Sequence, residues 1–159
     1  MADRVSPEQK RITREIAAPA DTVFTALNDP ETMRKFVPRC TAARWSHPEG
    51  QTGLGVGSVR HFTVPPGLTI SEELLAYEPG KSLVYRIVGG PVPIGAVLRN
   101  YRGVTMVKPL GPGRCRLEWT LHYTPRALAG PLVPIMARFL EDQVAAMADR
   151  LADLCAPPA

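Results

Sequence analysis

The chain has 159 residues, of which 45% are hydrophobic and 21% are charged, and its formal net charge is +4. This length and composition fit one globular domain with one hydrophobic core. The basic residues are scattered along the chain, which argues against a nucleic-acid surface, because such a surface needs a concentrated basic stripe.

The cysteines and the apolar runs limit location and chemistry further. The chain has 3 cysteines without any short spacing between them. An odd count excludes a fully paired disulfide framework, and no zinc-type spacing is present. No apolar run approaches the roughly 18 residues of a membrane span, and the first residues lack the apolar core of a signal peptide. We therefore predict a cytoplasmic protein with no membrane span, no metal and no cofactor.

The first predicted elements are a strand over Arg11–Ile16 and a short helix that opens at Pro19. Proline suits the first turn of a helix, where its missing N–H has no partner to lose. Val23, Phe24 and Leu27 give this helix one apolar face. We expect the residues before the first strand, over 1–9, to be frayed.

A second short helix is predicted directly after the first. Asp29 can cap it, Pro30 fits its first turn, and Glu31 favours its positive end. We expect this helix to end near Phe36, because Pro38 disfavours helical backbone in the residue before it.

The middle of the chain consists of strand-like runs separated by glycine- and proline-rich turns, with no further helix expected. The predicted strands are Thr41–His47, Ser58–Val64, Leu68–Tyr77, a run around Leu83–Ile87, Ala96–Lys108 and Arg114–Thr124. The glycines of 53–57 precede a strand, whereas a dinucleotide-binding loop must open a helix. The loop over 89–95 is predicted to be exposed or lid-like.

Tight turns allow the strand register to be predicted. If Val64 faces Leu68 across the first turn, then Arg60 faces Glu72, and both lie on the apolar face with Phe62. If Glu78 faces Lys81 across the next turn, then Ala76 faces Leu83, Leu74 faces Tyr85, and Glu72 faces Ile87.

The last hairpin is predicted from its own turn. If Gly111 faces Arg114, the inner face pairs Arg102 with Tyr123 and Met106 with Trp119. A two-residue type II turn is not the favoured hairpin connection, and a bulge of one residue would reverse the face.

A long amphipathic helix is predicted over Leu132–Leu154, with an apolar stripe that includes Met136 and Phe139. About 23 helical residues span roughly 35 Å, enough to cross a full sheet. The pattern therefore predicts an α+β fold, in which a curved antiparallel sheet wraps around one long helix and leaves room for a cavity.

At this point the sequence resembles a known superfamily. The segment from Ile16 to Glu31, I-x-A-P-A-x-x-V-F-x-A-L-x-D-P-E, is similar to the opening of polyketide cyclase/dehydratase and lipid-transport proteins, the SRPBCC or START-like group. The resemblance covers about residues 10–155 of a single domain spanning 1–159. It implies a helix-grip fold with a seven-stranded antiparallel sheet, two short helices and a long C-terminal helix. It also implies a cavity for a hydrophobic ligand, but no shared catalytic motif.

The predicted inner face supplies the candidate ligand-binding residues. They are Arg60, Phe62, Glu72, Leu74, Tyr85, Arg102, Trp119, Tyr123, Met136 and Phe139. A mostly apolar cavity with a few polar groups is the usual composition of a small-molecule site. Each polar member also has a structural interpretation.

For Arg60 and Glu72, the functional hypothesis is that the arginine anchors a ligand oxygen. The alternative, which we favour, is a structural ion pair between two semi-buried charges. Tyr85 and Tyr123 could orient a ligand, although core packing is favoured for both. Arg102, if it faces inward, would need a partner, which makes it the better candidate anchor. The histidines are expected at the surface or in loops.

Three functions remain open on the sequence alone. The first is a non-catalytic module that binds a small hydrophobic molecule, lipid-, polyketide- or aromatic-like, as a monomer or homodimer. The second is an enzyme of the cyclase/dehydratase type, in which an arginine stabilises an enolate and Tyr85 or Glu72 moves protons. The third is an interaction module resembling activators of a chaperone ATPase, which would act through its outer surface.

Overall fold

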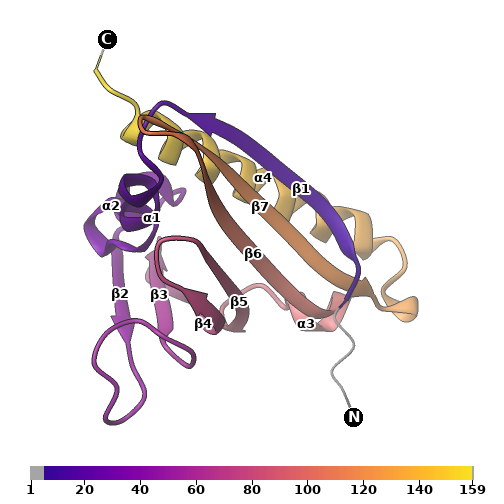
Figure 1. The fold of residues 1–159 in the computed structure, drawn as a ribbon. Helices are drawn as coiled ribbons and strands as arrows, with labels where there is room; N and C mark the ends of the chain where they lie inside the picture. Colours follow the sequence, from indigo (N-terminus) through magenta and orange to yellow (C-terminus); the bar gives the residue numbers. More distant parts are fainter. Residues whose placement is uncertain (1–5, 159) are drawn as a thin grey trace.

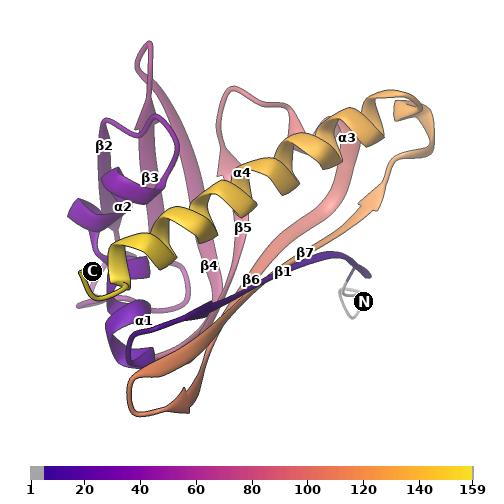
Figure 2. The ribbon, with the colours of Figure 1, turned by 90° about the horizontal axis from the view of Figure 1, so that it is seen from above.

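The computed structural model describes residues 6–158 and contains one seven-stranded antiparallel sheet, in the order β1-β7-β6-β5-β4-β3-β2. The strands are β1 (Glu8–Ile16), β2 (Ala42–Ser46), β3 (Val59–Val64), β4 (Leu68–Glu78), β5 (Ser82–Gly89), β6 (Leu98–Gly111) and β7 (Arg114–Pro125). The long helix α4 (Leu132–Cys155) crosses one face of this curved sheet (Figure 1, Figure 2). The α+β helix-grip prediction is confirmed.

Two short helices, α1 (Ala20–Asn28) and α2 (Pro30–Phe36), follow β1 as predicted and pack against α4. The carboxylate Oδ2 of Asp29 accepts a 2.8 Å hydrogen bond from the backbone N–H of Thr32, so Asp29 caps α2. Met33 and Phe36 anchor α2 in the core. The predicted start and end of this helix are both confirmed.

Several details differ from the predictions. β1 begins at Glu8 rather than Arg11, so it includes the end of the segment 1–9 that was expected to be frayed, and residues 1–5 of that segment lie outside the described residues. A further short helix, α3 (Ile94–Val97), precedes β6 where a loop and then a strand were expected. Buried Ile94 and Val97 hold α3 against the core, an effect that local propensity does not reveal. A single 3₁₀ turn, Ala127–Ala129, leads into α4.

The register of the β3–β4 hairpin matches the prediction, with Val64 opposite Leu68 and Arg60 opposite Glu72. In the β4–β5 pair, Leu83 faces Tyr77 rather than Ala76. An irregularity between Leu74 and Ala76 then shifts the register by one residue. The expected pairs Leu74–Tyr85 and Glu72–Ile87 are therefore present despite the error at the turn.

The face predicted for β6 is wrong. Gly111 does face Arg114, but an irregularity between Pro109 and Gly111 shifts the rest of the pairing by one residue. Arg102 therefore pairs with His122 instead of Tyr123, and Met106 pairs with Glu118 instead of Trp119. Because side chains alternate along a strand, Arg102 and Met106 lie on the outer face.

Candidate functional site

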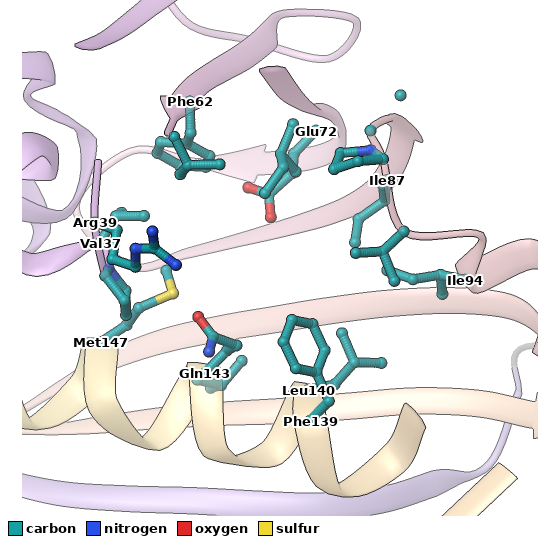
Figure 3. Close-up of a pocket in the computed structure, with 18 of the residues that line it drawn as sticks. Val37, Arg39, Phe62, Glu72, Ile87, Ile94, Phe139, Leu140, Gln143 and Met147 are labelled. Carbon is teal, nitrogen blue, oxygen red and sulfur yellow. The ribbon is translucent and has the colours of Figure 1, made fainter. Parts of the chain in front are cut away.

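A cavity of about 270 Å³ lies between the inner face of the sheet and α4. Its residues come from the sheet, from α4, from the segment after α2 and from the loop after β5, as Figure 3 shows. The sheet contributes Phe62, Ile70, Glu72, Tyr85, Ile87 and Tyr101, and α4 contributes Phe139, Leu140, Gln143, Val144 and Met147. Most of this surface is apolar, so the cavity suits a hydrophobic molecule.

The Glu72 carboxylate points into the cavity (Figure 3) and is held from behind by Arg60. Nε and Nη2 of Arg60 donate hydrogen bonds of 2.8 and 2.6 Å, both to Oε2 of Glu72. Arg60 is 0% exposed, and its Nη1 has no hydrogen-bond partner among the described residues. The structural ion pair is therefore present, and it also fixes the position of a carboxylate in the cavity wall.

Three aromatic rings surround the Arg60 guanidinium. Its Cζ atom lies 5.1 Å from the ring centroid of Phe62, 5.2 Å from that of Tyr85 and 5.7 Å from that of Trp45. Ring faces attract cations, and this attraction is stronger where water is excluded. The rings therefore help to offset the cost of burying the guanidinium and restrict its movement.

Tyr85 and Tyr101 are further polar residues that line the cavity. The Tyr85 hydroxyl accepts a 3.0 Å hydrogen bond from Nε1 of Trp119, and the two rings meet edge to face. Burial raises the pKa of Tyr85, and Glu72 raises it further. Burial also raises the pKa of Tyr101 well above its usual value, so both hydroxyls stay protonated at neutral pH.

The structure divides the ten predicted site residues into distinct groups. Phe62, Glu72, Tyr85 and Phe139 line the cavity, and Arg60 lies directly behind Glu72. The others fall elsewhere: Leu74, Trp119 and Tyr123 are buried in the core, Met136 is partly buried against it, and Arg102 is on the outer face.

Several lining residues were missed by the sequence analysis. Tyr101 was missed because the irregularity near the β6–β7 turn shifts the pairing by one residue, and the predicted register did not include this shift. Arg39 follows α2 in a loop, where periodicity carries no information about orientation. Gln143 lies one position before Val144 of the predicted apolar stripe, and only the rotation of α4 over the sheet turns its side chain toward the cavity.

The histidines lie away from the cavity, as expected. His61 bonds Ser46 and Ser71, and His47 bonds Ser58. Burial lowers the pKa of His61, with a smaller effect from the charge of Arg44. Across residues 6–158, no cluster of His, Cys, Asp or Glu could hold a metal ion, and no helix is both long and apolar enough to cross a bilayer.

Comparison with known proteins places this architecture in a family. Residues 9–156 match the family described as polyketide cyclase / dehydrase and lipid transport. The chain belongs to this family. An uncharacterized protein of Mycobacterium tuberculosis is 28% identical over 135 residues, which are 84% of this chain and 74% of that protein. The resemblance noted in the sequence is thereby confirmed.

Solved structures show the same fold at low identity. Norcoclaurine synthase from Thalictrum flavum, in complex with dopamine and hydroxybenzaldehyde, has a TM-score of 0.67 and 19% identity, covering 94% of this chain and 87% of that one. The protein XoxI from Bacillus cereus has a TM-score of 0.68 and 19% identity, covering 92% and 94%. At this identity the likeness establishes the fold alone.

Proposed function

We propose that this protein binds a small hydrophobic ligand, lipid-, polyketide- or aromatic-like, in the cavity between the sheet and α4. The observation that supports this most is the composition of the cavity wall, which is apolar apart from a few polar side chains. Family membership supports the same proposal, because the family includes lipid transport.

The two walls offer different contacts to such a ligand. Phe62 on the sheet and Phe139 on α4 face the same space from opposite sides (Figure 3). Aromatic rings bury a large apolar area and can stack on planar groups. Glu72 supplies polar recognition, because Arg60 occupies Oε2 and no hydrogen bond to Oε1 occurs within residues 6–158. A ligand hydroxyl or amine could therefore donate to Oε1.

A pair of neighbouring variants tests whether the cavity is the binding site. Ile87 lines the cavity, and Val88, the next residue of β5, is exposed. Ile87→Trp should fill part of the cavity and weaken binding of the neutral fluorescent probe N-phenylnaphthylamine by about tenfold or more. A tenfold loss of affinity corresponds to about 1.4 kcal/mol, which is less than the free energy gained by burying one large apolar group of the probe. Val88→Trp adds a comparable side chain outside and should leave the dissociation constant unchanged.

Fluorescence titration measures both constants, and circular dichroism checks that each variant is folded. Equal affinities for the wild type and Ile87→Trp would contradict the proposed location. Failure of the wild type to bind the probe would contradict the cavity-binding proposal itself. Native mass spectrometry of freshly purified protein, followed by extraction, would then identify the chemical class of any natural ligand.

A second candidate, a cyclase/dehydratase-type enzyme, is favoured by the position of Glu72. A carboxylate with one oxygen held by an arginine and the other facing an apolar cavity is a suitable general base. Tyr101 lines the same cavity, and its hydroxyl stays protonated. Norcoclaurine synthase, which shares the fold, binds dopamine and hydroxybenzaldehyde.

The β-hydroxy ketone formed by aldol addition of acetone to benzaldehyde is a simple substrate to test this second candidate. Its dehydration removes a proton from the carbon next to the carbonyl and releases the hydroxyl group as water. The product is a conjugated enone, whose ultraviolet absorbance measures the rate. The wild type should accelerate this reaction, and Glu72→Gln should lower the rate by about 100-fold or more. Equal rates for the wild type and Glu72→Gln would contradict a catalytic role for Glu72.

A further inference from the structure

The charges on the cavity wall do not balance. Among the residues of 6–158 that line the cavity, two carry charge, Arg39 and Glu72. The charge of Glu72 is already matched by Arg60 behind it. Arg39 has no such match, because no ion pair or hydrogen bond of its side chain occurs within the described residues. The cavity therefore carries one uncompensated positive charge.

Backbone conformation places this charge at the cavity. Arg39 adopts a left-handed conformation, with φ of 60°, which is uncommon for a residue with a side chain. The turn is closed by a 3.2 Å hydrogen bond from the N–H of Cys40 to the carbonyl of Val37. Figure 3 shows the Arg39 guanidinium directed into the same space as the Glu72 carboxylate and the Gln143 amide.

We propose that the ligand is an amphipathic carboxylic acid, whose carboxylate binds Arg39 while its apolar body fills the cavity. This inference rests on the proposed binding function and specifies the class of ligand. The planar guanidinium matches both oxygens of a carboxylate, and such charge-assisted pairs are stronger than neutral hydrogen bonds. The Gln143 side chain on α4 lines the same cavity and adds a polar amide to its wall.

The same charges define the orientation of the bound ligand in the cavity. A ligand carboxylate next to Glu72 would face a like charge in an apolar environment, which is costly. A carboxylate next to Arg39 meets the opposite charge and keeps contact with water, since Arg39 is exposed. The acid group therefore lies at the Arg39 end, and the apolar end extends between Phe62 and Phe139.

Competition between matched ligands tests the proposal. Decanoic acid, methyl decanoate and decanol share one apolar chain and differ in charge. In displacement of N-phenylnaphthylamine from the wild type, decanoic acid should compete about tenfold better than methyl decanoate, the expected contribution of a partly exposed charged pair. Arg39→Gln should remove this preference and leave the affinity for the ester unchanged, whereas Arg39→Lys should keep part of it.

Arg34→Gln is the matched control, because it removes the same charge from α2, away from the cavity, where Arg34 pairs with Glu31. It should retain the full preference for the acid. Equal competition by acid and ester in the wild type would overturn the proposal while leaving cavity binding intact. A preference that survives Arg39→Gln would overturn the assignment to Arg39. Failure of the probe itself to bind would overturn the proposed function and this inference together.

Discussion

Gly103 on β6 lies directly against the ring of Tyr85 on β5, its partner in the register. A Cβ atom at position 103 would lie 2.1 Å from Cζ of Tyr85 and 2.3 Å from its hydroxyl oxygen. The missing side chain therefore creates the space in which Tyr85 reaches Nε1 of Trp119 and flanks Arg60. A glycine in a strand often marks such a close approach.

This contact predicts that Gly103→Ala destabilises the protein. The added methyl group cannot fit without displacement of a fully buried ring, so we expect a loss of about 1–3 kcal/mol or more in the free energy of unfolding. Gly113→Ala is the control, since nothing lies within 4 Å of a Cβ at that position and its φ is not positive. Urea unfolding measures both, and similar losses for the two variants would contradict the steric explanation.

The buried ion pair predicts strong coupling between Arg60 and Glu72. Arg60→Met leaves the Glu72 carboxylate without its buried partner, which should cost about 3–5 kcal/mol. Adding Glu72→Leu to that variant should recover most of the loss, because two apolar side chains need no partner. A double-mutant cycle by urea unfolding measures the coupling energy, and additive losses would show that the two residues act independently.

Tyrosine burial predicts a loss of stability at alkaline pH. The pKa of Tyr101 is raised well above 10.0 by burial, so the unfolded chain releases this proton first as pH rises. The stability that Tyr101 contributes is therefore complete below about pH 10 and is lost above it, by about 1.4 kcal/mol per pH unit.

Comparison with Tyr101→Phe isolates this effect from other titrations. As pH rises above about 10, the free energy of unfolding of the wild type should fall relative to that of this variant, which has no hydroxyl to ionise at position 101. Tyr77→Phe should give a weaker pH dependence, because Tyr77 is only partly buried. Parallel curves for the wild type and Tyr101→Phe would show that its folded and unfolded pKa values are the same.

The capping of α2 predicts a local loss of stability. Asp29→Ala removes the acceptor for the N–H and the hydroxyl of Thr32, and should cost about 1 kcal/mol. Glu31→Ala, on the same helix turn, removes an exposed pair with Arg34 and should cost much less. Thermal unfolding followed by circular dichroism compares the two, and equal shifts in midpoint would argue against a capping role for Asp29.

The register of the β3–β4 hairpin was predicted correctly and that of the β6–β7 hairpin was not, because only the second has an irregularity close to its turn. A short turn pins the first residue pairs of a hairpin, which is why Arg60 and Glu72 were placed opposite each other correctly. A bulge depends on how the strand bends over the core and leaves no clear pattern in the residues. The irregularity after Pro109 therefore moved Arg102 to the outer face and brought Tyr101 to the cavity.

The sequence by itself determined the order of elements, the cap of α2, the amphipathic α4 and the pairing of Arg60 with Glu72, because each depends on residues close in the chain or joined by a tight turn. Only the tertiary structure decided which residues line the cavity. The rotation of α4 selects Gln143 and Met147, and a left-handed turn brings Arg39 beside them. The rotation of α4 and the position of Arg39 depend on packing between segments far apart in the chain, which local patterns do not encode.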